Sequence, residues 1–412
     1  MSKKTKKKGR GAAHKAVDPS VLKKFLKRYE NHCAQCQSAA SPTITKALKK
    51  CIQNGSSYLR IVLSYPASHT DNTAPVLLKP LLMTIRDERY MLGTDLCLWE
   101  IPLSNQDAAS LAILLELSGR TSYPFTKLEV LNCGIDTWSV ERLGRAIKVS
   151  QLTSLSLDYN EFKDEGVQCL VHGLEGNTKL VSLSLCYCNL GPASGTLLGR
   201  VLAESAVSEL YLTGNCLQCL GAVDLISAIA EHAQELAEEK PLLEQPMDLA
   251  HQILEAQGRT GISTAISGEP VDTERPAELP DRTTDRKIKK KGKRKSKKAA
   301  PPPGPWVRKL HLADNGIDAK GTEREAGVLE FSQLICSLIR YSEPLSELDL
   351  DDNCLGELPA TDILEALTYR NKGKLPRLKI KVTAQISPMT FKGILKQSGK
   401  LKVSKKRKKK KR

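Results

Sequence analysis

A short leucine pattern recurs along the chain, and it constrains the fold more than any other feature. The pattern reads Leu-x-Leu-x-x-(Asn/Cys)-x-Leu, with Ile, Val or Phe replacing some of the leucines. Clear copies begin at Leu96, Leu128, Leu155, Leu183, Leu210, Leu310 and Leu348. Weaker copies are expected at the edges, around Leu59 and Ile61 and around Leu378 and Ile380. A recurring unit of this size is typical of proteins built from stacked repeats.

The spacing of the copies leaves room for one strand and one helix in each repeat. The first five copies start 32, 27, 28 and 27 residues apart, and apolar residues follow with helical spacing, as in Val140, Leu143 and Ile147. The leucine pair of each copy should point inward from a short strand, and the Asn or Cys should bond to the backbone of neighbouring coils. One coil cannot bury its own apolar face, so coils must stack. The sequence therefore predicts an α/β leucine-rich-repeat solenoid, a horseshoe with parallel strands on the concave face and helices outside.

A gap of 100 residues between the fifth and sixth copies predicts an insertion. The helix of the fifth repeat should continue past Ala233 and Leu236, and a charged segment that follows it has the composition of disorder. The segment 18–52 has a helical pattern and is expected to cap the first coil. The expected organisation is a basic arm (1–17), a helical cap with a possible degenerate repeat (18–84), repeats (85–233), a helical extension and disordered insertion (234–304), further repeats (305–385), and an edge helix with a basic tail (386–412).

Positive charge is concentrated in three runs. The formal net charge is +17, but Lys and Arg crowd into the first ten residues, into 286–298 and into 405–412, so the rest of the chain is net acidic. No apolar stretch of about 18 residues is present, and no apolar stretch follows the basic N-terminus as a secretory signal would require. We therefore expect a reducing compartment, in which the twelve cysteines are thiols or metal ligands.

The chain resembles a known family. The strand Leu96–Ile101, the leucine-rich segment Leu180–Leu185, the Lys-rich insertion after the fifth repeat and the two repeats that follow it resemble the leucine-rich repeat-containing protein 71 family, within the larger ribonuclease-inhibitor-like repeat group. The resemblance covers about residues 85–370. It implies a scaffold of the ciliary axoneme and no catalytic residues. The basic C-terminal tail is not a feature of that family.

Catalysis and metal binding find little support in the sequence. No phosphate-binding Gly-rich loop and no nucleophile elbow is present. The pair Asp351 and Asp352 is better explained as solvated charge on a strand than as a catalytic dyad. Cys33 and Cys36, next to His32, could begin a zinc site, but no second Cys-x-x-Cys pair lies at the usual spacing. We therefore expect no enzyme, no cofactor and no resident metal.

The strand face is the candidate binding surface. Outward positions fall in columns on the concave side of a solenoid, where Tyr and Trp can anchor a protein partner. These positions are aromatic in the N-terminal half and acidic in the C-terminal half, which favours a basic partner. Ordinary solvated residues without a ligand are the alternative. The candidate contact residues are Trp99, Asn132, Asp158, Tyr159, Tyr187, Tyr211, Asp314, Asp349 and Asp351.

The basic runs allow several functions. They could bind an import receptor, the phosphates of RNA or DNA, or acidic protein tails such as those of microtubules, or they could simply keep the chain soluble. No aromatic residues interleave with the lysines, which argues against base stacking. The expectation is a scaffold in the ciliary axoneme; the alternatives are a nuclear or nucleolar RNA-associated protein and a regulator of a small GTPase. The residues expected to make these contacts are Lys6, Lys7, Lys8, Lys289, Lys290, Lys291, Arg294, Lys406, Arg407 and Lys408.

Overall fold

A computed structural model describes residues 18–65, 74–117, 122–243 and 306–399. The chain divides into two units, and the first of them (Met1–Ala237 with Pro302–Arg412) contains the repeats. Its strands are β1 (Arg60–Ser64), β2 (Asp95–Trp99), β3 (Lys127–Leu131), β4 (Ser154–Ser156), β5 (Ser182–Ser184), β6 (Glu209–Tyr211), β7 (Lys309–His311), β8 (Glu347–Leu350) and β9 (Lys379–Val382). The second unit (Glu238–Pro301) is described only at the end of one helix.

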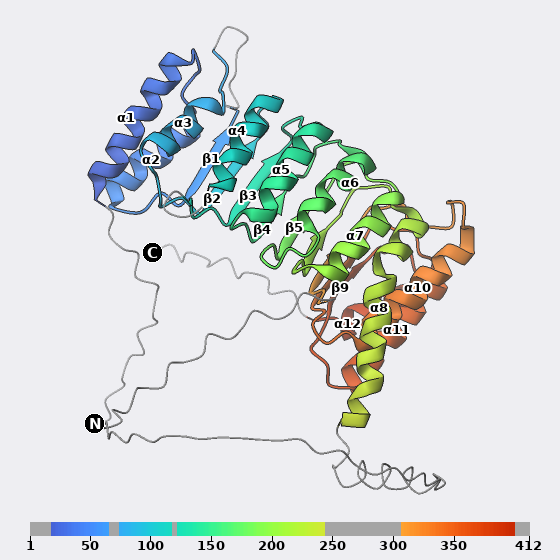
Figure 1. Cartoon of the computed structure of the whole chain (residues 1–412). Helices are drawn as coiled ribbons and strands as arrows, with labels where there is room; N and C mark the ends of the chain where they lie inside the picture. Colours follow the sequence, from blue (N-terminus) through green and yellow to red (C-terminus); the bar gives the residue numbers. More distant parts are fainter. Residues whose placement is uncertain (1–17, 66–73, 118–121, 244–305, 400–412) are drawn as a thin grey trace, which may run out of the picture. The chain divides into compact units, whose positions relative to one another are not determined.

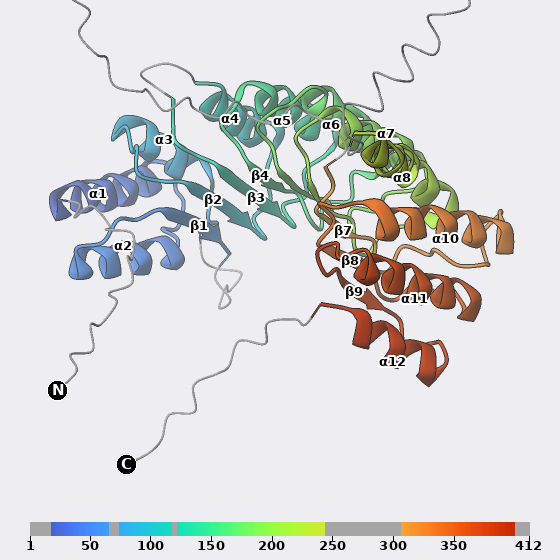
Figure 2. The ribbon, with the colours of Figure 1, turned by 90° about the horizontal axis from the view of Figure 1, so that it is seen from below.

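Helices alternate with these strands. They are α1 (Pro19–Gln35), α2 (Pro42–Asn54), α3 (Lys79–Asp87), α4 (Asn105–Glu116), α5 (Thr137–Val149), α6 (Lys163–Leu174), α7 (Ala193–Glu204), α8 (Gln218–Leu243), α10 (Arg324–Tyr341), α11 (Glu357–Lys372) and α12 (Pro388–Gln397). The strands form one open, parallel sheet in the order β1 to β9, and the helices from α4 onward follow one another along its outer side (Figures 1 and 2). This is the predicted α/β solenoid.

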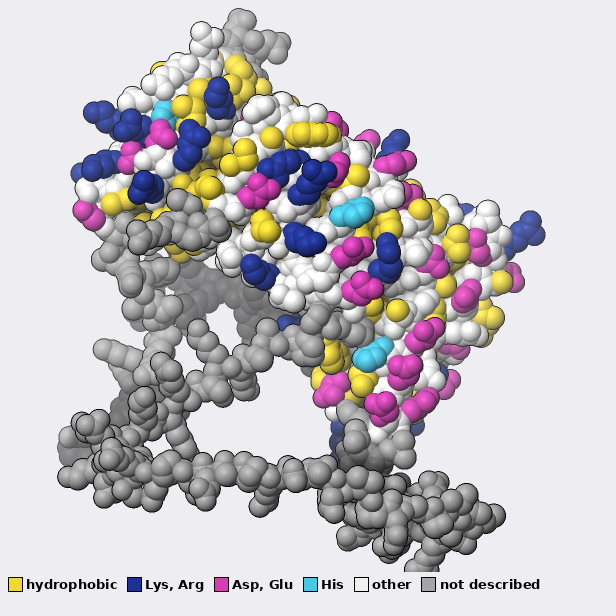
Figure 3. All heavy atoms as spheres, viewed as in Figure 1, with side chains coloured by type: hydrophobic (Ala, Val, Ile, Leu, Met, Phe, Trp, Pro, Cys, Tyr) yellow, Lys and Arg dark blue, Asp and Glu magenta, His cyan; other side chains and the backbone are white. Residues whose placement is uncertain are grey.

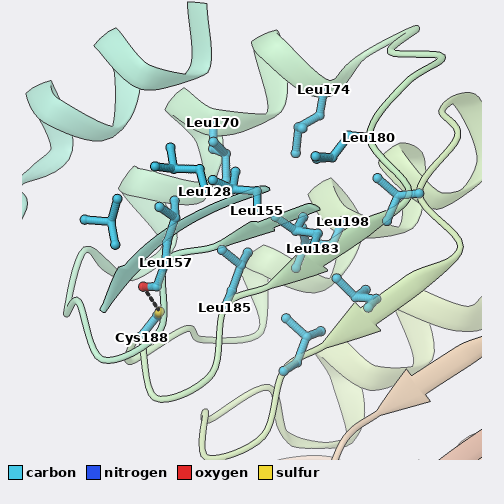
Figure 4. Close-up of a cluster of buried hydrophobic side chains, with 14 of the residues drawn as sticks. Leu128, Leu155, Leu157, Leu170, Leu174, Leu180, Leu183, Leu185, Cys188 and Leu198 are labelled. Carbon is cyan, nitrogen blue, oxygen red and sulfur yellow. Dashed lines mark hydrogen bonds between the residues drawn. The ribbon is translucent and has the colours of Figure 1, made fainter. Parts of the chain in front are cut away.

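The predicted register of the seven clear copies is confirmed. Leu155 lies opposite Leu183, and Leu183 lies opposite Leu210, so the leucines form continuous rows through neighbouring coils. These three leucines are 0–1% exposed, and Figure 4 shows Leu155 and Leu183 pointing toward the helices. Burying one leucine side chain contributes about 2 kcal/mol, so the rows supply much of the stability of the solenoid.

The insertion lies within a single repeat. β6 pairs directly with β7, and Leu210 lies opposite Leu310 although 100 residues separate them along the chain. α8 begins at Gln218 and runs 26 residues to Leu243, beyond Ala233 and Leu236 as predicted. The rest of the insertion lies outside the described residues. Two coils that are distant in sequence thus share one sheet.

The register predicted for the two edge copies is wrong. Ile61 and Leu63 lie opposite Leu96 and Leu98, so the inward pair of β1 is not Leu59 and Ile61. Leu59 is 36% exposed. Each edge copy is offset by two residues.

The same offset is found at the other end of the sheet. Ile380 and Val382 lie opposite Leu348 and Leu350, so the inward pair of β9 lies two residues later than the predicted pair of Leu378 and Ile380. Both edge copies lack the Asn or Cys that would mark the register, and each edge strand has only one neighbouring strand in the sheet.

Asparagine side chains join neighbouring coils. Asn160 is 1% exposed, and its Oδ1 accepts the backbone N–H of Cys133 at 3.0 Å in the preceding coil. Its Nδ2 donates to the carbonyl of Val130 at 2.8 Å and to that of Leu157 at 2.9 Å. Where Cys replaces Asn, as in Cys188, the thiol donates to the carbonyl of Leu157 at 3.3 Å (Figure 4). The motif residue therefore pairs backbone groups that would otherwise be buried without partners.

Candidate functional site

Residues one to three positions beyond the ends of the strands form a column along one edge of the sheet, which we call the rim column. Each of its members has a positive φ, between 50° and 73°, and each N–H up to Asp314 donates to a carbonyl of the next coil. The members are Glu100, Asn132, Tyr159, Tyr187, Gly214, Asp314 and Asp352. Adjacent members of the column are thus held side by side by backbone hydrogen bonds.

Two exposed tyrosines occupy the middle of the rim column. The rings of Tyr159 and Tyr187 are stacked, with centroids 4.8 Å apart and planes 6° apart. Their side chains remain 53% and 41% exposed. A left-handed backbone is unfavourable for a bulky side chain and costs about 1 kcal/mol or more. The solenoid therefore holds two aromatic rings in solvent at positions that Gly or Asn would occupy with less strain.

Gly214 makes room for this stack. A Cβ atom at Gly214 would lie 2.1 Å from Cε1 of Tyr187, so any larger residue there would collide with the ring. The ring of Tyr187 therefore reaches over Gly214 toward Asp314, the next member of the column. The importance of Gly214 could not be seen in the sequence, because it depends on which residues share a column.

On the strands themselves, the C-terminal half of the inner face carries lysines beside the expected carboxylates. Nζ of Lys309 lies 3.0 Å from a carboxylate oxygen of Glu209, and Nζ of Lys379 lies 3.1 Å from one of Glu347. Lys381 forms an ion pair with Asp349. The lysines come from the neighbouring strands and neutralise the carboxylates in place.

Asp349, predicted as a contact residue, is therefore not available to a partner. It is 4% exposed, and Lys381 already binds its carboxylate. His311 packs nearby, and burial holds the pKa of its imidazole below the ordinary value although the Asp349 and Glu347 carboxylates oppose this shift. Tyr211 stands against His311 edge-on, with ring centroids 4.7 Å apart. These side chains form a packed polar layer on the sheet.

Trp99 is also engaged within the chain. Its Nε1 donates to the Glu129 carboxylate at 2.9 Å, and the guanidinium of Arg60 lies 5.2 Å from the ring centroid. Burial would raise the pKa of Glu129, but hydrogen bonds from Lys127 and Trp99 outweigh this effect and hold the pKa below its usual value. Trp99 is only partly exposed and lies at a distance of two coils from Tyr159.

The other predicted contact residues differ in their availability. Asp158 accepts hydrogen bonds from the hydroxyl of Ser156 and the N–H of Cys186, so its carboxylate fixes the turn below the tyrosines. Asp351 accepts the N–H of Asp352 at 3.2 Å. Asn132 and Asp314 are exposed members of the rim column. The structure therefore places the free surface at the rim rather than on the strands.

Comparisons with known proteins agree with this geometry. A family model described as "Leucine Rich repeat" matches residues 151–171 and 305–323. The body is a leucine-rich-repeat solenoid. The mouse (Mus musculus) ribonuclease inhibitor is 25% identical to this chain over 284 residues, which are 65% of this chain and 55% of that protein. The chain thus spans about half the length of this relative. Both matches are to leucine-rich-repeat or ribonuclease-inhibitor sequences, which agrees with the repeat architecture of the fold.

The cysteines of this leucine-rich-repeat chain are mostly packed inside. Cys133 and Cys188 are buried at the motif position, as predicted. Cys33 is buried beside Tyr29, and the Cys36 thiol lies 4.0 Å from the sulfur of Met83. In the part of the chain that the structure describes, no three His, Cys, Asp or Glu side chains are grouped as metal ligands would be.

Positive charge also lies on the folded N-terminal cap, where sequence analysis had not sought it. α1 and α2 carry exposed lysines, and among the described residues none of them has a carboxylate within ion-pair distance. Figure 3 shows Lys and Arg gathered over the α1–α3 end, whereas Asp and Glu predominate toward α8. The exposed lysines are Lys23, Lys24, Lys27, Lys46, Lys49 and Lys50. Helical spacing opposite the apolar face could have identified them.

The predicted polyanion contacts themselves lie outside the described residues. This holds for all ten: Lys6, Lys7, Lys8, Lys289, Lys290, Lys291, Arg294, Lys406, Arg407 and Lys408. No helix among the described residues is long and apolar enough to cross a membrane.

Proposed function

We propose that this leucine-rich-repeat scaffold binds one protein partner at the rim column and is part of a larger assembly, such as the axoneme of a cilium. The observation that carries the proposal is the exposed stack of Tyr159 and Tyr187. Tyrosine anchors bury a large area at low entropic cost, and such anchors dominate protein interfaces. Here both rings are preorganised by each other and by a strained backbone.

Two features support the second part of the proposal, in which the basic arms contact a polyanion within the assembly. The arms carry long runs of Lys and Arg, and the first of them directly precedes the lysine-bearing cap of α1 and α2. Exposed lysines without acidic partners attract an extended negative charge, whether from phosphates or from acidic protein tails. A ciliary location rests on the resemblance to the leucine-rich repeat-containing protein 71 family.

The rim-column proposal is tested by affinity purification from ciliated cells. The double variant Tyr159→Ala and Tyr187→Ala should lose the partner of the wild-type chain while its thermal unfolding curve stays cooperative. Tyr369→Ala is the matched control, because Tyr369 on α11 is also 53% exposed but lies on the helical side. Equal recovery of the partner by the wild type and the double variant would count against the proposal.

A nuclear RNA-associated role remains the second candidate, because the basic arms and the lysine-bearing cap would also attract phosphates. Binding to RNA would then depend steeply on salt, since each neutralised phosphate releases counterions. Deleting 286–298 and 405–412 should remove both nuclear retention and this salt dependence. A tagged copy that concentrates in cilia, before and after the deletions, would exclude this alternative.

A further inference from the structure

We infer that the rim column binds an arginine side chain of the partner, with the guanidinium held between the ring of Tyr187 and the carboxylates of Asp314 and Asp352. This inference rests on the proposed function, because it specifies the chemistry of the partner at the same surface. It goes further by distinguishing arginine from lysine and from neutral anchors.

The carboxylates of Asp314 and Asp352 carry negative charge that no cation of the chain pairs with among the described residues. On the strand face, the carboxylates of Glu209, Glu347 and Asp349 are each matched by a lysine. Asp314 and Asp352 are exposed, and in the described parts of the chain neither has a Lys or Arg within 4.0 Å. The rim therefore has negative charge that the chain itself does not neutralise.

Tyr187 lies close to this charge. It precedes Gly214 in the column, its ring extends over Gly214, and Asp314 comes next. The pKa of the Tyr187 hydroxyl is raised, first by lost hydration and then by Tyr159 and by the nearby carboxylates of Asp314 and Asp352. An aromatic ring and two carboxylates thus border the same exposed space.

The ligand that matches both features is a planar cation. A guanidinium can stack on an aromatic face and donate paired hydrogen bonds to a carboxylate at the same time. Lysine offers a point charge without a planar face, so it would use the carboxylates but gain less from the ring. Because the surface is open and the tyrosines lie side by side, an arginine on an extended basic segment could reach it without a conformational change.

The test uses the full chain and fluorescent peptides in fluorescence anisotropy, at about 150 mM salt to screen diffuse attraction. One peptide carries two arginines in a Gly/Ser background, and its matched versions carry two lysines or two citrullines. The wild type should bind the arginine peptide about tenfold more tightly than the citrulline peptide and about threefold more tightly than the lysine peptide.

Variants assign the effect to the rim. Asp314→Asn with Asp352→Asn should weaken arginine binding about fivefold or more, whereas Tyr187→Leu should abolish the preference for arginine over lysine. Glu330→Gln, at an exposed position of α10, is the control for a lost charge elsewhere. Equal binding of the arginine and citrulline peptides would overturn the inference, as would a weakening by Glu330→Gln as large as that caused by the rim variants.

The two proposals can fail separately. If Tyr159→Ala with Tyr187→Ala loses the cellular partner but the peptides show no preference for arginine, the inference is wrong and the proposed function stands. If the double variant keeps its partner, the proposed function fails whatever the peptides show.

Discussion

Substitution of Asn215 should lower the free energy of unfolding more than substitution of most other polar residues of the solenoid. It is 4% exposed, and its Oδ1 accepts the N–H of Cys188 at 3.0 Å and that of Leu190 at 3.1 Å. Its Nδ2 donates to the carbonyl of Leu185 at 2.9 Å and to that of Leu212 at 2.8 Å. Asn215→Ala would leave all four backbone groups without this partner, in a place that water does not reach.

Asn315 offers a matched comparison in the next coil. It is fully buried at the same motif position, but its Nδ2 makes only two bonds, to the carbonyls of Leu212 and Ala313. Its Oδ1 is buried without a hydrogen-bond partner in the described structure. The asparagine ladder is thus incomplete at the junction of β6 and β7, where the insertion interrupts the repeat.

The expected magnitudes follow from these contacts. At about 1 kcal/mol for each buried hydrogen bond, Asn215→Ala should lower the free energy of unfolding by about 4 kcal/mol. Asn315→Ala loses two bonds, about 2 kcal/mol, but it also removes an unsatisfied oxygen worth about 1 kcal/mol, so its net cost should be about 1 kcal/mol. The same substitution at equally buried sites should thus differ by about 3 kcal/mol.

Urea unfolding followed by circular dichroism measures both variants. The urea midpoint should fall for both variants, and it should fall further for Asn215→Ala than for Asn315→Ala. The slope of each transition should stay that of the wild type, because only then does a shift of the midpoint report a change in stability. Equal losses for the two variants, or a larger loss for Asn315→Ala, would refute the reasoning that the hydrogen bonds of this ladder decide the stability.

Three further predictions concern buried groups. Arg370→Met should lower the free energy of unfolding by about 3 kcal/mol, because the fully buried guanidinium donates to four backbone carbonyls at 2.7–3.0 Å. Urea unfolding measures this loss, and a variant as stable as the wild type would contradict the prediction. A thiol reagent at neutral pH should label exposed Cys216 and Cys354 before Cys188, as read by mass spectrometry, and equal rates would disprove the packing. Burial raises the pKa of Cys133 from 9.0 to about 11, so the folded thiol keeps a proton that the unfolded one loses. The contribution of Cys133 to the free energy of unfolding should therefore fall by about 1 kcal/mol between pH 8 and pH 10, and Cys133→Ala should reduce the pH dependence of stability by that amount; an unchanged pH dependence would count against it.

The repeat motif made the interior predictable. Each clear copy carries two inward aliphatic residues in fixed spacing, and six of the seven carry Asn or Cys three residues later, so the inward rows and the helical layer could be deduced from sequence. β1 and β9 lack the motif residue, and their registers were each misplaced by two positions. The register of a strand is defined by the strands that pair with it, and an edge strand has only one such neighbour.

The same reason explains what was missed at the candidate site. Lys309 faces Glu209 only because β6 pairs with β7 across the insertion, and Lys381 faces Asp349 only in the true register of β9. Without those pairings, the strand face seemed acidic and Asp349 seemed free. Tyr159 and Tyr187 were recognised as outward residues, but their stacking and their left-handed backbone required the structure.

The central claim is that the partner lies against the rim rather than the helices, and site-specific photocrosslinking tests it most directly. A photoreactive residue would replace Glu161, exposed and two residues beyond Tyr159, or Trp138, which is 48% exposed on α5. In ciliated cells, the account predicts one strong partner adduct from position 161 and none from position 138. An adduct from position 138 alone would contradict it, because the partner would then bind the helical side.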